Sequence, residues 1–275
     1  MITNKLAAIK RSDDTSNLDD LFGYSTNDVE NTSTIEVVGS GSLPDALKEY
    51  DAFLSAREKE SDSKLVLSKK ELELFLLCSK FQDKYESNQS KSGIFLSRLI
   101  KNTYDSNENN FKFEFDFSLI THFCHKIKAD ENRPLRMYIT GDVGQDAFYD
   151  CENMNVKVIG DVGHLSAYCS ENMNFDISGD TNISFGWRSN NLSAKIGGNG
   201  GYRFGFYSKN MRAVIEKDTG TEFGNGSKDL LVLVKGNVRS DKYHRNGVQS
   251  LTLDEYYGSE LEKEMPKVYK QFSDI

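Results

Sequence analysis

Aspartates that recur at one position of a repeat are the first candidates for chemistry. They lie at multiples of 19 residues, and Asn199 occupies the fourth such position: Asp142, Asp161, Asp180 and Asp218. Stacked carboxylates repel one another, and a calcium ion would relieve the repulsion. At about 4.8 Å in water each repulsion is only about 1 kcal/mol, which a hydrogen bond within the turn offsets. Because Asn199 breaks the column and the nine-residue calcium-binding repeat is absent, we expect each carboxylate to bond its own turn and to bind no metal.

A second group of potential ligands lies in the run His122-Phe123-Cys124-His125. On a strand, His122 and Cys124 would share one face and His125 would lie on the other. This spacing is not typical of zinc, and no second ligand pair accompanies it. We therefore interpret these residues as ordinary strand residues.

Arginines could also form an anion site on the outside of the fold. The candidates occupy different positions of the repeat, which favours a solvated face: Arg188, Arg203, Arg212, Arg239 and Arg245. No Ser-His-Asp arrangement, phosphate loop or paired-carboxylate motif is found in the sequence. The sequence thus predicts no catalytic residue, no cofactor-binding residue and no metal ligand.

The elements that position these residues follow from the repeat. Gly141-Asp142 returns as Gly160-Asp161 and Gly179-Asp180, and later copies are weaker. A second marker keeps the same step of 19 residues: Asn153-Met154, Asn172-Met173, Asn191-Leu192, Asn210-Met211 and Asp229-Leu230. Two markers in register indicate a solenoid, in which each unit buries its apolar face against its neighbours.

Each unit contains two stretches that alternate between apolar and polar residues, which predicts two strands. The first stretch begins with Leu135, Met137 and Ile139 and repeats to Leu230, Val232 and Val234. The second contains two neighbouring columns, both expected inside the tube: Tyr149, Tyr168, Trp187 and Phe206, and Ala147, Ser166, Phe185, Phe204 and Phe223. We therefore expect the indole of Trp187 to be buried.

The predicted fold is mainly β: a right-handed parallel β-helix of about six coils. Residues 1–41 are polar and are expected to form a disordered tail. Residues 42–110 contain three amphipathic helices, with capping residues at Ser42 and Ser68, that could cover one end of the solenoid. The alternating run 111–117 starts the β-helix, which extends to residue 255, and residues 256–275 form a helical C-terminal cap.

Composition narrows the class of function. The net charge of −8 and the pI near 5.2 argue against binding to nucleic acid or to an anionic membrane. No stretch approaches the roughly 20 apolar residues of a membrane helix, and no signal peptide is evident, so we expect a cytoplasmic protein. Cys151 and Cys169 occupy adjacent columns and should point to opposite faces, which predicts free thiols.

The repeat resembles a known family. Gly141-Asp142-Val143-Gly144 and Gly160-Asp161-Val162-Gly163 look like the GXGXG repeat, and Gly186, Gly205 and Gly224 match a further family glycine. The resemblance covers about residues 134–253. It departs from the family where the Gly-Gly pair before each strand is replaced, as by Glu152-Asn153. That family forms the C-terminal domain of the glutamate synthase large subunit and one of the subunits of formylmethanofuran dehydrogenase, where it resembles a scaffold. The resemblance suggests a prokaryotic and, more narrowly, an archaeal setting.

These observations favour a noncatalytic scaffold or assembly subunit that presents a solenoid surface to protein partners. Two alternatives remain open. One is a self-assembling filament protein similar to bactofilins, and the other is an enzyme with a site between the helices and the β-helix.

Overall fold

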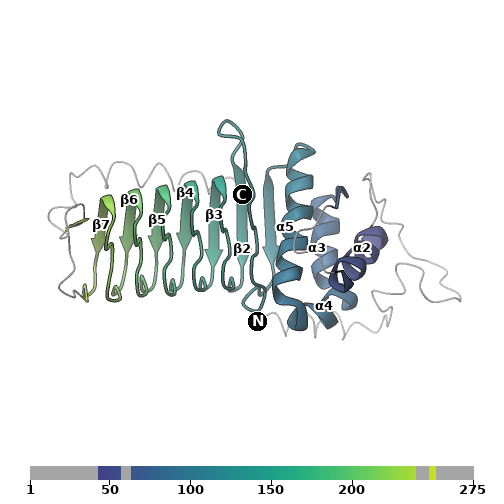
Figure 1. The fold of residues 1–275 in the computed structure, drawn as a ribbon, viewed down its shortest axis with the longest axis horizontal. Helices are drawn as coiled ribbons and strands as arrows, with labels where there is room; N and C mark the ends of the chain where they lie inside the picture. Colours follow the sequence, from purple (N-terminus) through teal and green to yellow (C-terminus); the bar gives the residue numbers. More distant parts are fainter. Residues whose placement is uncertain (1–42, 57–62, 240–247, 252–275) are drawn as a thin grey trace, which may run out of the picture.

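A computed structural model describes residues 43–56, 63–239 and 248–251. The strands form one parallel sheet in sequence order, β1-β2-β3-β4-β5-β6-β7-β8. Figure 1 shows β2 to β7 side by side in a row, with the helices gathered beyond β1. The strands are β1 Asn110–Glu114, β2 Leu135–Thr140, β3 Glu152–Ile159, β4 Glu171–Ile177, β5 Asn190–Ile196, β6 Lys209–Ile215, β7 Lys228–Val234 and β8 Val248–Leu251. The predicted parallel β-helix is confirmed.

The 19-residue step sets the register of the sheet. Leu135 pairs with Met154, which pairs with Met173, and the same step continues to β7. The residues predicted to face the core on these strands are all buried, because side chains of a strand alternate between its two faces. The first coil is longer, since Phe111 on β1 pairs with Met137. The alternating run at 111–117 is therefore the first coil, as predicted.

The second stretch of each coil is not a strand, which corrects the prediction. It is a run of turns in which every second residue is left-handed. In the third full coil, for example, Ser184, Gly186 and Arg188 have φ of 62°, 68° and 56°. A chain that alternates in this way does not follow the period-2 rule of an extended strand. Two consecutive positions, such as Phe185 and Gly186, are consequently both buried.

An inner aromatic ladder runs through the core of the solenoid, built from this stretch and, at Phe175, from strand β4. It consists of Phe123, Phe148, Phe175, Phe185, Phe204 and Phe223. Neighbouring ring centroids are 5.2 to 6.1 Å apart, and every ring is at most 1 % exposed. The position after Phe185 is Gly186, whereas the position before Phe148 is Ala147, so a large residue sits beside a small one in both coils.

Helices precede the sheet in the chain. They are α2 Leu43–Ser55, α3 Lys69–Leu77, α4 Ser79–Tyr85 and α5 Gln89–Asp105, with a 3-10 turn η2 Glu86–Asn88. The predicted capping box at Ser68 is present, since its hydroxyl accepts the N–H of Glu71 and the Glu71 carboxylate accepts the N–H of Ser68. The helix that begins after Ser68 ends at Cys78, where the backbone is extended, and α4 follows directly from Ser79.

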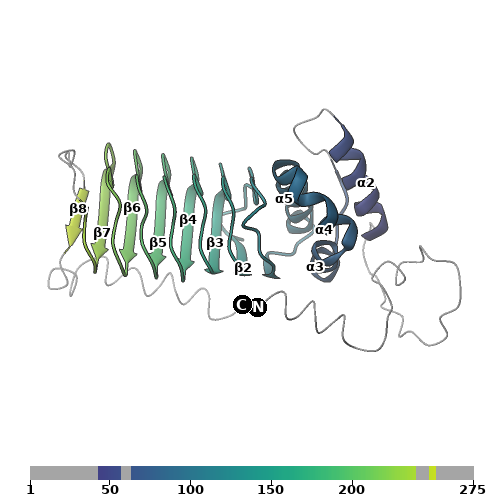
Figure 2. The same ribbon diagram turned by 90° about the horizontal axis from the view of Figure 1, so that it is seen from below.

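Helix α5 covers the first edge of the sheet, as Figures 1 and 2 show. The Ser97 hydroxyl accepts the N–H of His125 at 2.9 Å and donates to the backbone carbonyls of Gly93 and His122. A side chain at Gly93 would collide with the carbonyl of Thr121, so the helix backbone lies directly against the coil. The Tyr104 hydroxyl similarly accepts the N–H of Asp130. The helix thus pairs edge groups that would otherwise need water or another chain.

The expected tail at 1–41 and the expected C-terminal cap at 256–275 lie outside the described residues. Within the described ranges, none of the helices is both long and apolar enough to span a bilayer.

Candidate functional site

An outer aromatic ladder runs along the surface of the solenoid, one ring per coil. It consists of His125, Tyr149, Tyr168, Trp187 and Phe206. Successive ring centroids are separated by 5.0, 5.2, 5.2 and 5.8 Å. The ladder continues at both ends, to His122 at 5.2 Å from His125 and to Tyr207 at 4.6 Å from Phe206. It is therefore an unbroken row of rings.

This ladder is half-buried rather than enclosed, which corrects the prediction for Tyr149, Tyr168, Trp187 and Phe206. Each ring lies two positions after an inner-column residue, as Trp187 does after Phe185. In an extended strand these two side chains would share a face, but a left-handed residue stands between them. The left-handed residue turns the second ring outward. Trp187 is therefore only partly buried: its indole nitrogen is enclosed, as expected, but the rest of the side chain reaches solvent.

The run from His122 to His125 belongs to this ladder and is not a strand. His122 and Cys124 are left-handed, with φ of 61° and 55°. Cys124 points into the core against Met137, whereas both histidine rings lie on the ladder. The place of His125 was not predicted, because it precedes Tyr149 by 24 residues instead of 19. His125 and Tyr149 are each flanked by the same pattern of left-handed residues, and this equivalence is visible only in the structure.

Two of the arginines considered for an anion site flank the ladder. The Arg188 guanidinium lies 5.8 Å from the Trp187 ring and donates to the Tyr168 hydroxyl at 3.5 Å. The Arg203 guanidinium lies 5.0 Å from the Phe206 ring and forms an ion pair with Glu222 at 2.5 Å. Arg212 is elsewhere and donates to backbone carbonyls. Arg239 is exposed on the last coil, and Arg245 lies outside the described residues.

Large apolar side chains beside the ladder are also exposed. Ile183 is 40 % exposed and Tyr207 is 55 % exposed, and both lie within a few residues of Trp187 or Phe206. We call the ladder together with Ile183, Arg188, Arg203 and Tyr207 the outer aromatic face. Exposed large apolar residues at these positions make the ladder and its surroundings a candidate interaction surface.

The aspartate column plays a structural part that differs from the one expected. The Asp142 carboxylate accepts the N–H of Asp161 in the next coil at 2.7 Å, and Asp161 accepts the N–H of Asp180 in the same way. Asp180 bonds Asn199, and Asn199 in turn accepts the N–H of Asp218. Each side chain therefore bonds the next coil rather than its own turn. Asn199 keeps the series intact, because its amide oxygen is also an acceptor.

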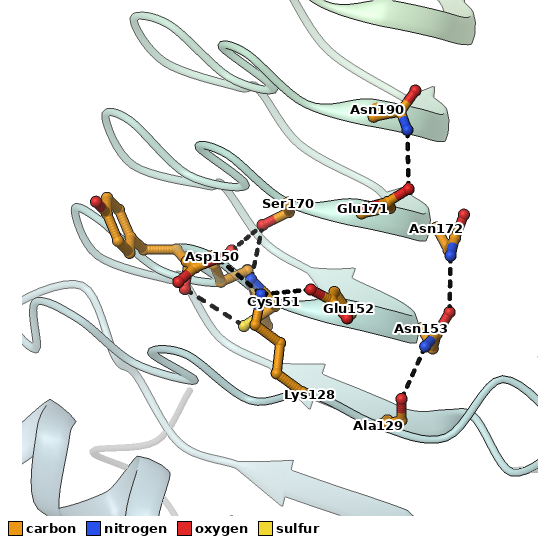
Figure 3. Close-up of polar contacts among 12 residues, drawn as sticks. Lys128, Ala129, Asp150, Cys151, Glu152, Asn153, Ser170, Glu171, Asn172 and Asn190 are labelled. Atoms are coloured by element: carbon orange, nitrogen blue, oxygen red, sulfur yellow. Dashed lines mark hydrogen bonds and ion pairs between the residues drawn. The ribbon is translucent and has the colours of Figure 1, made fainter.

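Polar side chains form further ladders on another side of the coil (Figure 3). The Asn172 amide donates to Asn153 at 3.0 Å, and Asn153 donates to the carbonyl of Ala129 at 2.7 Å. Both asparagines are left-handed, with φ of 54° and 57°. Asparagine tolerates this conformation, and its side chain pairs with its counterpart in the next coil. The second sequence marker is thus a column of left-handed residues at the start of the strands.

A small charged cluster lies at the start of this region. Figure 3 shows Lys128 between Asp150 and Glu152, and its ammonium group is 2.7 Å from each carboxylate. Burial lowers the pKa of Lys128, but the hydrogen bonds to both carboxylates outweigh it and leave the pKa raised. The lysine therefore stays charged at neutral pH, and the cluster joins the first coil to the second.

All four cysteines are free, as predicted, although Cys169 is only half-buried. The buried Cys151 thiol donates to the carbonyl of Cys124 at 2.6 Å. Burial raises the pKa of Cys151 to about 12, and it raises the pKa of Cys124 well above its usual value. Both thiols are therefore protonated at neutral pH and are poor nucleophiles.

Among the residues that the structure describes, no group of three or more His, Cys, Asp or Glu side chains could hold a metal ion. Comparisons with known proteins add no assignment: no family model, no curated protein and no solved structure matches this chain. The outer aromatic face is the candidate functional site, on the strength of its geometry.

Proposed function

We propose that this protein is a noncatalytic scaffold or assembly subunit, and that it binds protein partners through the outer aromatic face. The observation that carries the proposal is the half-exposed row from His125 to Phe206. Tyrosine, tryptophan, phenylalanine and arginine are the residues enriched at protein interfaces, where they supply much of the binding energy. In this face they lie together on the turn stretches of successive coils.

Packing at the helix junction supports a scaffold over an enzyme with a site between the helices and the β-helix. Phe81 and Tyr85 of α4 contact Phe115 of the first coil at 6.2 and 6.0 Å between ring centroids. The backbone of Gly93 lies against Thr121. These contacts pack α4 and α5 directly against the first coil, which favours a closed junction over a substrate site between them.

The helices at the first edge of the sheet also argue against a bactofilin-like filament. Head-to-tail assembly needs an open sheet edge at each end of the unit. Helix α5 covers one edge and pairs its backbone groups through Ser97. We retain the filament as the second candidate, because β8 is paired with β7 alone among the described strands.

Kinship with the GXGXG-repeat family is part of the same proposal. Gly186, Gly205 and Gly224 have φ of 68°, 65° and 60°, a conformation that glycine adopts without strain. The coil geometry thus suits glycine at these three further positions of the resemblance, although Phe148 and Ala167 adopt the same conformation in earlier coils. We also propose a cytoplasmic location. The net charge of −8 supports the further proposal that the protein has no nucleic-acid partner.

Copurification tests the scaffold proposal. The full chain, tagged, is recovered from its source cells beside two tyrosine variants, and the bound proteins are identified by mass spectrometry. Tyr168→Ser alters the outer aromatic face. Tyr138→Ser is the matched control, because Tyr138 is also half-buried but faces outward from strand β2.

We expect one partner to accompany the wild-type chain and Tyr138→Ser, and to be lost with Tyr168→Ser. Recovery of the same partner with all three chains would show that the partner docks outside the outer aromatic face. Sedimentation of the purified chain as long polymers would favour the filament instead.

A further inference from the structure

The outer aromatic face has a preferred partner chemistry, and charge is the first indication of it. Arg188 is exposed, and no carboxylate among the described residues pairs with it. The neighbouring carboxylates are already engaged, since Asp150 pairs with Lys128 and Glu222 pairs with Arg203. An arginine beside aromatic rings and free of an internal carboxylate is suited to pair with a carboxylate from outside.

The histidines point the same way. His122 and His125 extend the ladder, and His164 lies on the coil between Tyr149 and Tyr168. These are three of the four histidines in the chain, and the fourth lies outside the described residues. Asp146 is a carboxylate on this face that is held by Gln145 and by no described cation. In a protein whose net charge is −8, Arg188 and the imidazole rings of His122 and His125 thus lie beside the aromatic rings of this face.

Backbone pairing decides how a partner can bind here. The carbonyl oxygens of Tyr168, Trp187 and Phe206 each accept an N–H from the preceding coil, at 2.9 Å. A partner strand cannot add to the face through main-chain hydrogen bonds when the coils already use those groups. Contacts must therefore come from side chains, which rules out strand addition at this position.

The length of the face sets the size of the partner segment. Coils about 4.8 Å apart make the ladder from His125 to Phe206 roughly 20 Å long, which matches about six residues of extended chain. The segment would run along the solenoid axis, across the strands.

We propose that the outer aromatic face binds a short, extended, acidic segment of a partner protein. A carboxylate of the segment pairs with Arg188, and its apolar or aromatic side chains pack against Trp187 and Tyr207. This inference rests on the proposed scaffold function and names the chemistry of the partner.

Trp187 makes the test direct, because it is the one tryptophan in the chain and lies in the face. A phage-displayed library of short random peptides is panned against the full chain. Enriched peptides are then synthesised, and their affinities are measured from the change in Trp187 emission and by calorimetry. Arg188→Glu reverses one charge of the face. Arg239→Glu is the matched control, an exposed arginine on the same solenoid but outside the face.

We expect the enriched peptides to carry Asp or Glu beside aromatic or aliphatic residues and to shift Trp187 emission. Arg188→Glu should weaken their binding about tenfold or more, whereas Arg239→Glu should change it less than about twofold. A peptide whose acidic residue is changed to lysine should recover affinity for Arg188→Glu.

Three results would overturn the inference. They are a consensus without acidic residues, affinities that Arg188→Glu leaves unchanged, and the absence of enriched peptides. A glycan array is probed in parallel. Binding of glycans without binding of peptides would show that the ligand is a carbohydrate and not an acidic segment. The scaffold proposal is tested separately. It would still hold if a partner copurified with the wild-type chain and was lost with Tyr168→Ser, whatever the peptide experiments gave.

Discussion

Two aromatic ladders run side by side along this solenoid and differ in what surrounds them. The inner ladder is sealed in the core, as Phe185 and Phe204 illustrate, with no measurable exposure. The outer ladder has similar ring spacing, but Trp187 and Phe206 are only partly buried. The two rings of one coil, Phe185 and Trp187, are only two positions apart in the chain. Similar ring spacing and similar residue types therefore occur in two different environments, the closed core for the inner ladder and the surface for the outer one.

The largest expected effect on stability comes from a substitution that breaks the inner ladder. Phe185→Ala should lower the free energy of unfolding by about 3–5 kcal/mol, because it removes a buried ring and leaves a cavity between Phe175 and Phe204. Phe206→Ala, the matched change in the outer ladder, should cost only about 1 kcal/mol. Urea denaturation of both variants measures the difference. Equal losses would mean that the two ladders are not distinct in stability.

A second prediction concerns Trp187, whose half-exposed ring should contribute less than a core residue. Trp187→Ala should cost about 1–2 kcal/mol, less than the 3–5 kcal/mol typical of a fully buried ring. In the wild-type chain, iodide should quench its emission appreciably, because the side chain reaches solvent. Emission that iodide leaves untouched would place the indole in the core and contradict the assignment of the outer ladder.

A smaller effect is expected in the aspartate column. Asp180→Ala removes the acceptor for the N–H of Asn199 and should cost about 1 kcal/mol. Asp180→Asn should cost less, since Asn199 itself bonds the next coil with an amide oxygen. Thermal unfolding of the two variants gives the comparison. A larger loss for asparagine than for alanine would show that the carboxylate charge matters more than the hydrogen bond.

The smallest expected effect is that of metal removal. The carboxylates of the column already accept backbone N–H groups, as Asp142 does from Asp161. Dialysis against EDTA should leave the melting temperature unchanged within error. A melting temperature that rises with added calcium and falls again with chelator would show that the column binds calcium. A ligand that binds only the folded state raises stability as its concentration increases.

Much of the sheet could be predicted from sequence because its cause is local. Leu135, Met137 and Ile139 alternate with polar residues, and alternation in an extended chain assigns each side chain to one face. The capping box at Ser68 was equally local and is present. The break at Cys78 was not predictable, since the apolar stripe continues across it.

The candidate site was harder to predict, for a reason visible in three residues. Tyr149 and Ala147 alternate just as strand residues do, so pattern alone placed both in the core. Phe148 between them is left-handed, with φ of 56°. Phenylalanine rarely adopts that conformation, and no signal in its residue type could have announced it. His125 was missed for a further reason, because the first coil is longer than the rest.

The sequence by itself determined the repeat length, the parallel sheet and the inner face of its strands, since a period of 19 residues and a period of two are properties of the chain. The tertiary structure alone decided which aromatic column faces solvent, and which coil each aspartate bonds. Those outcomes depend on hydrogen bonds between coils, such as that from the N–H of Arg188 to the carbonyl of Phe206, which hold alternate residues in a left-handed conformation. Such bonds form only when the neighbouring coil is in place.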